Sequence, residues 1–302
     1  MTLQQLRYLI AIAECGSISA AAHTLYVSQS SLSVAVRDIE QETGVTVFTR
    51  SKKGITVTSD GMELLGYARQ IVEQADLMER RYSSKGVAAP AHLAVSTQHY
   101  AFCVEAFIEL MEEMEGDGYD CTLRETRTGE IIDDVRDFRS DIGVLYLSSF
   151  NERVLSQAFD AAEISFTQLF EAKLHVFVGQ NHPLATHSLV RAEDLASYPR
   201  YSFEQGTTNS FYYAEEPLSQ LPHSKNIVIS DRGTLSNLLA NHTGYTISTG
   251  LLSSEMHTGI VSIPLDTDET MRVGYIVRSD RRLSPLAERY IEKLRRRIVR
   301  DA

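Results

Sequence analysis

The chain has 302 residues, of which 43% are hydrophobic and 23% charged, and its net charge at pH 7 is −11. This composition is that of a globular protein with room for two or three domains and a large core. The sequence contains no run of about 18 apolar residues and does not start with a basic segment followed by an apolar one, so we expect neither a membrane span nor a secretory signal.

Three cysteines, Cys15, Cys103 and Cys121, are odd in number and widely spaced. Such a set is typical of reduced thiols, so we expect a cytoplasmic protein. The favoured interpretation is that they are small buried residues. A redox switch between Cys103 and Cys121 stays open as the alternative.

Charge is distributed unevenly along the chain. Residues 1–60 hold five basic side chains and five acidic ones, namely Arg7, Arg37, Arg50, Lys52 and Lys53 against Glu14, Asp38, Glu40, Glu42 and Asp60. The other 24 of the 29 basic residues and 35 of the 40 acidic ones carry the whole net charge of −11. An acidic body repels nucleic acid, so any contact with a polyanion must be confined to a small patch.

Residues 1–44 are predicted to form three short helices. Apolar residues recur at helical spacing over residues 3–13, and Gly16 ends this helix. A second helix runs to residue 25, a turn follows, and Ser28 is a good N-cap for the third helix. The third helix buries a stripe made of Leu32, Ala35, Val36 and Ile39. Two helices joined by a short turn, with small alanines where they cross, predict a helix-turn-helix.

The outward face of the third helix carries Gln29, Ser30, Ser33 and Arg37. A glutamine amide can pair with a base edge, short serines allow close approach, and an arginine can reach a phosphate or a guanine. The alternative is a plain solvated helical hairpin. Against that alternative, residues 45–58 alternate as a β-hairpin that bears three of the five N-terminal basic residues near its tip. A basic wing beside such a helix can supply the phosphate contacts that flank base contacts, so we expect this region to bind DNA.

A longer pattern makes the interpretation more specific. Its residues are Ala21, Ala22, Leu25, Ser28, Gln29, Leu32, Ser33, Ile39, Glu40, Gly44, Val45, Phe48 and Arg50, followed by ITVTSDG. In this order they resemble the winged helix-turn-helix of the LysR-type transcriptional regulators. Two positions depart from the family pattern, since Ser30 stands where many members have proline and Val34 where many have a polar or basic residue. The second departure removes a DNA contact, so the base preference of relatives cannot be carried over.

The DNA-binding interpretation assigns a role to nine residues. It places Gln29, Ser30, Ser33 and Arg37 in the major groove, Ser17 and Ser28 against phosphates, and Arg50, Lys52 and Lys53 along the flanking DNA backbone.

A long helix is predicted to follow the wing. Residues 58–60 cap a helix of about 24 residues, roughly 36 Å long, that runs to about residue 83. Its apolar flank has no nearby core, so we expect it to pack against the same helix of a second copy. The alternative is a helix folded back on its own domain. The family resemblance likewise implies a dimer that faces one two-fold-related operator. We therefore predict a DNA-binding domain over residues 1–58 and a linker helix with its hinge over 59–90.

From residue 92 onward, strands and helices are predicted to alternate, which is typical of an α/β domain with parallel sheets. Strands are predicted at residues 92–95, 119–125, 142–146, 174–178, 200–203, 226–229, 245–248 and 271–278. Helices are predicted at residues 102–113, 130–138, 211–219, 234–241 and 285–300. Such sheets bind ligands beyond the carboxyl ends of their strands.

The segments FTQLFEAKLHVFVGQNHPLA and LLANHTGYTIST extend the resemblance into this second part. In the LysR family it is a two-lobed α/β effector-binding domain, similar to type 2 periplasmic binding proteins. We predict this domain over residues 91–302, with lobe I at 91–164 and 268–302 and lobe II at 165–267. The resemblance implies a small-molecule effector between the lobes.

Small polar loops follow several predicted strands and precede helices, where exposed N–H groups suit an anion. The expected effector contacts are the hydroxyl and amide groups of Ser96, Thr97, Thr126, Thr128 and Gln205, with Arg127 or Arg232 to neutralise an anion. The alternative for each residue is a helix cap or a turn. A nearby aromatic cluster is expected to be mostly core, with one or two members lining the pocket: Tyr201, Phe203, Phe211, Tyr212 and Tyr213.

Other classes of protein fit less well. The sequence has no HExxH, GxSxG, GxxxxGK(S/T) or CxxC motif, so we expect no enzyme. Its nine histidines make no metal site, and we expect no cofactor. A solute-binding protein would explain residues 91–302 but not 1–60. Whether the protein activates or represses transcription stays open, because the same domains serve both kinds of regulator. The expected partners are double-stranded DNA, a small effector, a second copy in a homodimer (by family analogy a homotetramer) and RNA polymerase, with no membrane.

Overall fold

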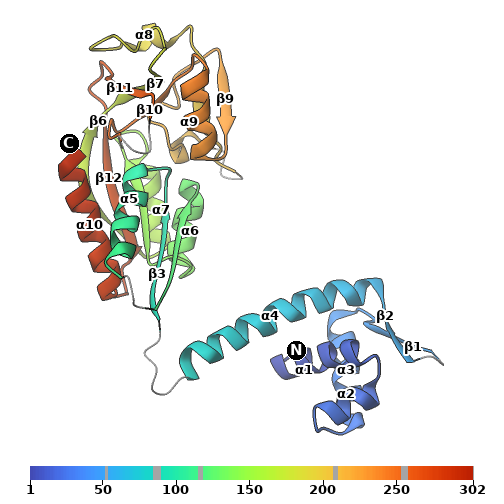
Figure 1. Ribbon diagram of the computed structural model, residues 1–302. Helices are drawn as coiled ribbons and strands as arrows, with labels where there is room; N and C mark the ends of the chain where they lie inside the picture. The colour runs from blue at the N-terminus through green and yellow to red at the C-terminus, as the bar shows by residue number, and fades with distance from the viewer. Residues whose placement is uncertain (52–53, 84–89, 115–117, 207–209, 253–257, 302) are drawn as a thin grey trace. The chain divides into compact units, whose positions relative to one another are not determined.

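The computed structural model describes residues 1–51, 54–83, 90–114, 118–206, 210–252 and 258–301. Its contacts divide the chain into two compact units, Met1–Ala89 and Pro90–Ala302 (Figure 1). Among the described residues, no helix combines the length and the apolar character needed to cross a membrane.

The first unit is built on three helices, α1 (Leu3–Cys15), α2 (Ile18–Thr24) and α3 (Gln29–Thr43). Each begins at a hydroxyl side chain, because Thr2, Ser17 and Ser28 accept hydrogen bonds from backbone N–H groups of the first turn. Helices α1 and α3 end at Gly16 and Gly44, whose φ angles of 62° and 73° are the left-handed conformation of a helix stop. The three predicted helices are therefore present, with Ser28 as the predicted cap and Gly16 as the predicted stop.

The wing is an antiparallel hairpin of β1 (Phe48–Ser51) and β2 (Gly54–Val57). Glu40 of α3 ties the hairpin to the helices, since its Oε1 accepts hydrogen bonds from the backbone N–H groups of Val47 (2.7 Å) and Phe48 (3.2 Å). The core beneath contains fully buried side chains from the helices and the base of the wing, among them Leu9, Ile12, Leu32, Ile39 and Val47. The recognition helix and wing thus share one core, which fixes their relative position.

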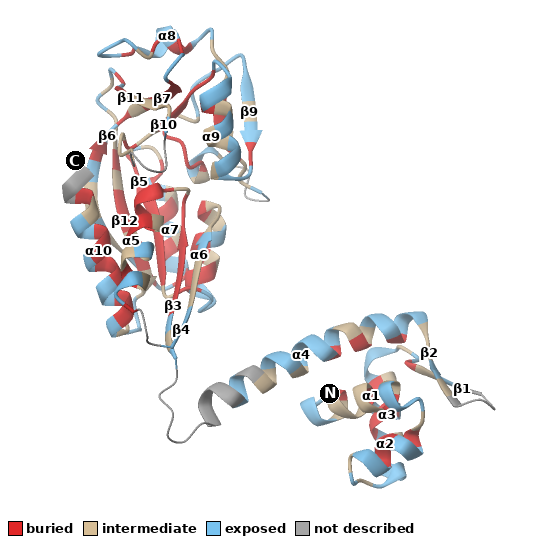
Figure 2. Ribbon diagram, viewed as in Figure 1, coloured by how far each residue is buried: buried red, intermediate tan, exposed pale blue. Residues whose placement is uncertain are grey.

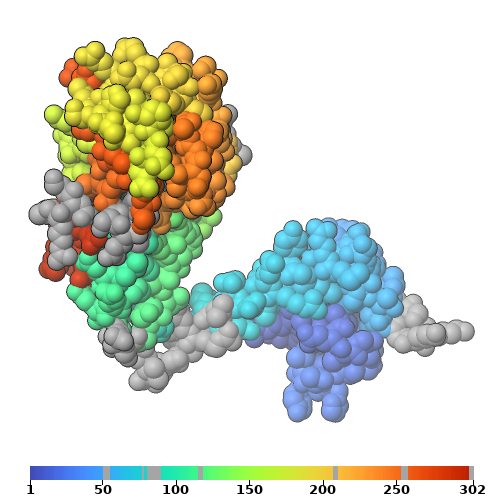
Figure 3. Space-filling model, turned by 45° about the horizontal axis from the view of Figure 1, so that its top comes forward, coloured from blue at the N-terminus to red at the C-terminus, as the bar shows by residue number. Residues whose placement is uncertain are grey.

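Helix α4 (Ser59–Ser83) is 25 residues long and lies along α1. Leu65 and Ala68 are buried in the core of the first unit, and Nη2 of Arg7 donates a hydrogen bond of 2.6 Å to Oδ1 of Asp76. Figure 3 shows α4 lying against the helices of this unit. One flank of α4 is therefore folded back on its own domain, as the alternative interpretation expected. The other flank is considered under the proposed function.

The larger sheet of the second unit has five strands in the order β4–β3–β5–β12–β6. They are β3 (Ala91–Thr97), β4 (Tyr119–Glu125), β5 (Ile142–Leu147), β6 (Ile164–Lys173) and β12 (Thr270–Arg278). Strands β4, β3 and β5 are parallel, and β12 runs antiparallel to β5 and β6. Helices α5 (Ala101–Glu112) and α10 (Pro285–Asp301) cover one face, whereas α6 (Thr128–Arg136) and α7 (Glu152–Ala161) cover the other, so the central strands are buried (Figure 2).

The second lobe has a three-stranded antiparallel sheet in the order β10–β7–β11 and a parallel pair, β8 with β9. These strands are β7 (His175–Gly179), β8 (Arg200–Phe203), β9 (Asn226–Ile229), β10 (Thr246–Ser248) and β11 (Ile260–Pro264). Helix α9 (Arg232–Asn241) packs on β7, and the short α8 (Ala192–Leu195) precedes β8. The carboxyl ends of β8 and β9 lead into residues that contact the first lobe.

Several expectations for this unit differ from the structure. Strands β6 and β11 and helix α7 were not predicted, and parallel pairing is wrong for β6, β12 and the three-stranded sheet. Because β6 pairs with β12 over its whole length, the first lobe reaches Lys173, past the boundary predicted at residue 164. The helix predicted over residues 211–219 is only a 3₁₀ turn, Phe211–Tyr213. Pro217 explains this difference, since its ring blocks a helix interior and it has no N–H to donate.

Candidate functional site

The outward face of α3 is the first candidate site. Gln29, Ser30 and Arg37 are exposed, and Ser33 is half-buried beside them. Val34 shares this part of the surface, with 42% of its side chain exposed. The opposite face of α3 lies in the core of the first unit. All four residues predicted to meet the major groove therefore remain accessible on one helix.

The start of α3 holds a cluster of hydroxyl groups. Oγ of Ser28 accepts a hydrogen bond of 3.1 Å from the backbone N–H of Ser31 and lies 2.9 Å from Oγ of Ser30 and 2.7 Å from Oγ of Ser31. Oγ of Ser19 on α2 donates a hydrogen bond of 3.1 Å to Oε1 of Gln29. This bond engages the carbonyl end of the Gln29 amide, so its NH₂ end is the one suited to meet a base acceptor.

The residues predicted to contact phosphates are placed less completely. Ser17 caps α2, where its Oγ accepts a hydrogen bond of 3.4 Å from the backbone N–H of Ala20. Lys52 and Lys53, and the side chain of Arg50, lie outside the described residues.

Sequence reasoning missed Tyr26, which stands in the turn between α2 and α3. Its side chain is 94% exposed, and its φ of 55° is in the left-handed region that non-glycine residues seldom adopt. An aromatic ring so fully exposed beside a recognition helix is a candidate contact residue. The available signal was a large aromatic residue in the short turn between two helices.

Three predicted effector contacts are engaged within the first lobe. Oγ of Ser96 donates a hydrogen bond of 2.6 Å to Oδ2 of Asp134, and Oγ1 of Thr97 donates one of 2.8 Å to its neighbouring carbonyl at Gln98. Oγ1 of Thr128 accepts one of 2.7 Å from Nε2 of Gln98. All three residues are buried, and none lines a described cavity. They hold the ends of β3 and α6 in place.

The strongest contact between the lobes joins His99 of the first lobe to Glu215 of the second. Nδ1 of His99 lies 2.7 Å from one carboxylate oxygen, and its backbone N–H donates a 2.6 Å hydrogen bond to the other. The imidazole ring also stacks on Phe203 at 3.8 Å between ring centres. Burial by itself would lower the pKa of His99, but the facing carboxylate of Glu215 outweighs it and the pKa is raised. A charged, buried pair therefore joins the lobes.

Three further contacts form, with this pair, what we call the inter-lobe clasp, and one of them is the ion pair between Arg232 of the second lobe and Glu125 of the first. Arg127 of the first lobe forms an ion pair with Glu204, which follows β8 in the second lobe. Oη of Tyr146 on β5 donates a hydrogen bond of 3.2 Å to the carbonyl of Ala214. Sequence reasoning proposed Arg127 as a ligand residue but did not find His99, Glu204 or Glu215, because their partners are far apart in the chain.

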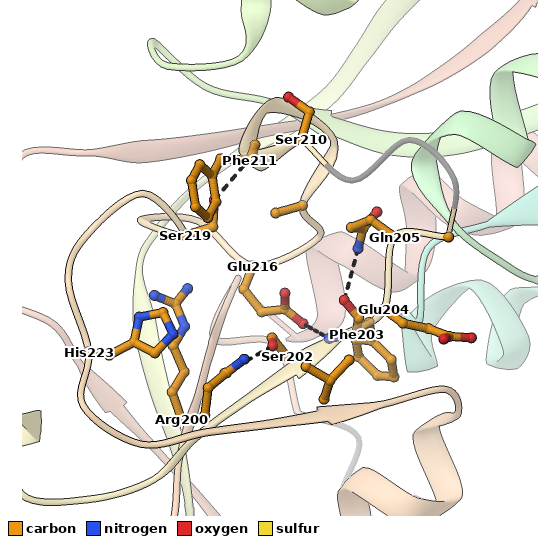
Figure 4. A pocket seen from close by; sticks show the side chains of 14 residues that line it. Arg200, Ser202, Phe203, Glu204, Gln205, Ser210, Phe211, Glu216, Ser219 and His223 are labelled. Atoms are coloured by element: carbon orange, nitrogen blue, oxygen red, sulfur yellow. Dashed lines mark hydrogen bonds between the residues drawn. The ribbon is translucent and has the colours of Figure 1, made fainter.

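The remaining predicted effector residues line three different cavities. Thr126 and Arg127 border one of about 160 Å³ beside the clasp, and Arg232 borders one of about 40 Å³. Arg232 is paired there, since its Nε donates a hydrogen bond of 2.8 Å to Oε1 of Glu125. Gln205 borders a larger cavity of about 340 Å³ within the second lobe (Figure 4). Phe203 and Phe211, of the aromatic cluster, also line this third cavity.

The three cysteines differ in their exposure to solvent. Cys103 is buried, and burial raises the pKa of its thiol to about 12. Burial also raises the pKa of Cys121, whereas Cys15 is exposed. Among the described residues, no three His, Cys, Asp or Glu side chains gather closely enough to hold a metal ion.

Two family descriptions match this architecture. That of the bacterial regulatory helix-turn-helix protein, lysR family, matches residues 3–62, which hold α1 to α3, the wing and the start of α4. That of the LysR substrate binding domain matches residues 117–298, more than half of the chain. The chain belongs to the LysR family of transcriptional regulators. The resemblance drawn from the first 61 residues is thereby confirmed, and so is a DNA-binding regulator with an effector-binding domain.

Relatives of this LysR regulator match over nearly their whole length. The DNA-binding transcriptional dual regulator OxyR of Escherichia coli K12 is 24% identical over 300 residues, which are 96% of this chain and 92% of that protein. The regulator YbhD of the same strain is 24% identical over 302 residues, which are 97% and 90% of the two chains.

Solved structures agree on the fold. The OxyR of Corynebacterium glutamicum with hydrogen peroxide bound has a TM-score of 0.51 at 21% identity, covering 99% of this chain and 95% of that one. Full-length BenM has a TM-score of 0.50 at 18% identity, covering 99% and 97%. The predicted fold class, a winged helix-turn-helix with a long linker helix followed by a two-lobed α/β domain, is confirmed.

Proposed function

We propose that this LysR regulator binds a two-fold-related operator as a homodimer and that a small anion between the lobes modulates transcription. The accessible face of α3 carries the proposal for DNA. Gln29, Ser30, Ser33 and Arg37 enter the major groove, while Ser17, Ser28 and the wing residues Arg50, Lys52 and Lys53 meet phosphates. Residues 1–60 have no net charge, whereas the rest of the chain is acidic. This distribution supports DNA binding by the first unit, because only that part escapes electrostatic repulsion by the DNA.

The second flank of α4 supports the dimer. Tyr67, Ile71 and Met78 lie four and seven residues apart, so they share one face, and they are 61%, 45% and 59% exposed. Large apolar side chains in such a row favour a partner helix with the same row. Residues 1–58 then form the DNA-binding domain, and 59–90 form the dimerising linker. A tetramer and a contact with RNA polymerase are proposed by family analogy.

The inter-lobe clasp supports an anionic effector. Arg127 and Arg232 stand at the ends of β4 and β9, yet each is already neutralised by a glutamate, Glu204 or Glu125. An entering anion replaces one of these carboxylates and so exchanges a contact between the lobes for a contact with ligand. Such an effector changes the arrangement of the lobes only through its different affinity for the closed and opened forms.

A response to peroxide through a thiol is not part of this proposal. Related proteins are described as hydrogen peroxide-inducible genes activators. Peroxide attacks a thiolate, and the pKa of Cys103 at about 12 leaves almost no thiolate at neutral pH. The raised pKa of Cys121 acts in the same direction. We therefore favour reversible binding of a ligand over oxidation of these two cysteines.

Footprinting on genome-wide DNA fragments, with and without residues 1–60, tests the proposed function. The full chain should protect two-fold-symmetric sites, and the shortened chain should protect none. Size measurements on both proteins should show the second unit intact, so that absence of protection reflects the missing DNA-binding part. No protection by the full chain at low salt would contradict the proposal.

A further inference from the structure

The second lobe contains a cavity of about 340 Å³ that no described residue of the first lobe lines (Figure 4). Its described lining lies between Arg200 and Val228, on β8, on β9 and on the segment that joins them. That segment, in its described part, has only the 3₁₀ turn Phe211–Tyr213 as regular structure, and the cavity lies between it and the strands. This cavity is larger than either space beside the inter-lobe clasp, at about 160 and 40 Å³.

A buried carboxyl group faces this cavity without a full set of partners. Glu216 is only 3% exposed, and its Oε1 accepts a hydrogen bond of 2.8 Å from the backbone N–H of Phe203. Its Oε2 is buried and has no hydrogen-bond partner among the described residues. Figure 4 shows this side chain reaching into the cavity. Buried carboxylate oxygens normally accept hydrogen bonds, so Oε2 is an acceptor that lacks its donor.

A second acceptor in the cavity lacks its donor as well. Nε2 of Gln205 donates a hydrogen bond of 3.1 Å to the carbonyl of Phe203, which fixes which end of the amide is oxygen. The Oε1 atom is buried and, within the described part of the chain, has no partner. Glu216 therefore accepts from the backbone N–H of Phe203, and Gln205 donates to the carbonyl of the same residue. Each of the two side chains has one oxygen for which the described residues provide no hydrogen-bond donor.

The guanidinium of Arg200, which also lines the cavity, does not supply the missing donors. Nη1 and Nη2 of the buried Arg200 donate hydrogen bonds of 2.8 Å to the carbonyls of Leu218 and Pro217. Burial, then the charge of Glu215, raises the pKa of Glu216 to about 7 in spite of this guanidinium. A bound cation with N–H donors would favour the ionised carboxyl, whereas an anion would meet it with repulsion.

We infer that this cavity is a second ligand site, which takes a small organic cation carrying an ammonium or amidinium group. The N–H groups of the ligand donate to Oε2 of Glu216 and Oε1 of Gln205. Its carbon frame lies against the aromatic rings of Phe203 and Phe211, which line the same space. The site differs in place and in charge preference from the anion site proposed between the lobes.

The position of Glu216 in the chain connects this site to the clasp. The carbonyl of Ala214 accepts the hydrogen bond of Tyr146, Glu215 holds His99, and Glu216 faces the cavity. Three consecutive residues thus touch the first lobe and the ligand site. A ligand that holds Glu216 therefore acts on the lobe contacts through one peptide unit. This regulatory consequence rests on the proposed function, whereas binding itself does not.

Calorimetric titration of the full chain with benzamidine, in the absence of DNA, tests the site. Benzoate and benzyl alcohol serve as ligands of similar size without the cation. We expect benzamidine to bind and both controls to fail. The Glu216→Gln variant, which keeps the shape of the side chain, should bind benzamidine about tenfold more weakly or worse, because it has no charged acceptor. The matched Glu193→Gln variant, at an exposed position on α8, should bind as the parent does.

The pH dependence of benzamidine binding is a second test, and it uses the unchanged protein. With a pKa of about 7, the ionised fraction of Glu216 rises about tenfold from pH 6 to pH 8, and the affinity for benzamidine should rise with it. The other charged or titratable groups that act on Glu216, respond to its charge or line the same cavity are Glu215, Arg200, His99, Tyr100, Tyr146, Glu204 and His223. Glu216→Gln, where it folds, should make the affinity much less dependent on pH.

Three results would overturn the inference. They are no benzamidine binding at millimolar concentration, equal binding by Glu216→Gln, or an affinity that does not change between pH 6 and pH 8. Because no DNA is present in this titration, failure here leaves the footprinting result untouched, and failed footprinting leaves benzamidine binding measurable.

Discussion

His99 is the residue on which contact between the two lobes depends most directly. It offers Glu215 two donors at once, a ring nitrogen and a backbone N–H, while its ring covers Phe203. The side chains of His99 and Glu215 are only 4% and 7% exposed, so solvent screens their charges little. Removing one partner of such a pair leaves the other charge buried alone, which typically costs more than the pair contributes.

A double-mutant cycle on this pair gives the first prediction. His99→Ala and Glu215→Ala should each lower the free energy of unfolding by about 3–5 kcal/mol, and the double variant should be destabilised by less than the sum. The raised pKa of His99 sets the pH range over which the ion pair stabilises the fold. Its contribution is fully present below the unfolded value of 6.5 and is lost as pH rises through the raised value. Urea unfolding between pH 5 and pH 9 checks both statements, and additive effects would contradict them.

Arg37 gives the second prediction, at the other site. It is the exposed cation on the outward face of α3. Arg37→Ala should weaken operator binding by roughly 1–3 kcal/mol, because it removes an interaction with a base edge or a phosphate. Fluorescence anisotropy with an operator found by footprinting measures this. Arg153→Ala, exposed on α7 of the second unit, is the matched control and should bind as the parent does. Unchanged affinity in Arg37→Ala would remove this residue from the interface.

At the scale of elements, α4 serves two partners at once. One flank packs on α1 through Leu65 and Ala68, and a separate row of Tyr67, Ile71 and Met78 is exposed. Sequence reasoning treated a dimer contact and folding back as alternatives, because an apolar pattern shows that a flank is buried but not against what. A helix of 25 residues has enough faces for both.

The third prediction concerns the open row of α4. Ile71→Glu should shift the protein from dimer to monomer at micromolar concentration, because a buried, unpaired carboxylate is costly. The control is Arg69→Glu, which makes the same residue at an exposed position two places away, on the far side of the helix. Light scattering after size-exclusion chromatography measures both variants. A dimer that persists in Ile71→Glu would show that another surface joins the copies.

The fourth prediction concerns the wing. Lys52→Ala combined with Lys53→Ala should flatten the salt dependence of operator binding by up to about two units of log–log slope, one for each phosphate that the wing no longer neutralises. Anisotropy titrations at salt concentrations from about 50 to about 300 mM give the slope, a range over which the affinity of phosphate-binding proteins changes steeply. An unaltered slope in the double variant would mean that the tip of the wing does not touch the DNA backbone.

Element prediction succeeded where a local signal decides the structure and failed where tertiary contacts do. Strands β4, β8 and β9 have the predicted bounds, and each is followed by a polar loop that the sequence marks clearly. Strand β6 was missed, since as an edge strand it alternates buried and exposed residues irregularly. A helix was predicted over residues 211–219. In the structure, Glu215 and Glu216 turn inward to His99 and Phe203 instead.

At the scale of the whole molecule, the two units have separate hydrophobic cores. The accessible face of α3 could be predicted because its residues lie within nine consecutive positions, from Gln29 to Arg37. The cavity lined by both His99 and Glu215 could not, because these residues are 116 positions apart. A helix face follows from local periodicity, whereas a cavity depends on how distant segments meet.

Separate cores lead to the fifth prediction. The fragment 90–302 should unfold in urea with the same free energy and the same pH dependence as the corresponding transition of the full chain, because no core residue is removed with the first unit. Circular dichroism and tyrosine fluorescence follow the transition. A fragment that is markedly less stable than this transition would show that the first unit supports the second.

Val34 has a consequence for the DNA itself. Its exposed methyl groups stand on the outward face of α3, at a position where the family pattern often has a polar or basic residue. In the major groove, an apolar side chain favours the C5-methyl group of thymine. A cytosine methylated at C5 presents the same group at the same place. We therefore expect operators of this regulator to be sensitive to the methylation state of a cytosine facing Val34, so that an epigenetic mark could replace a base change.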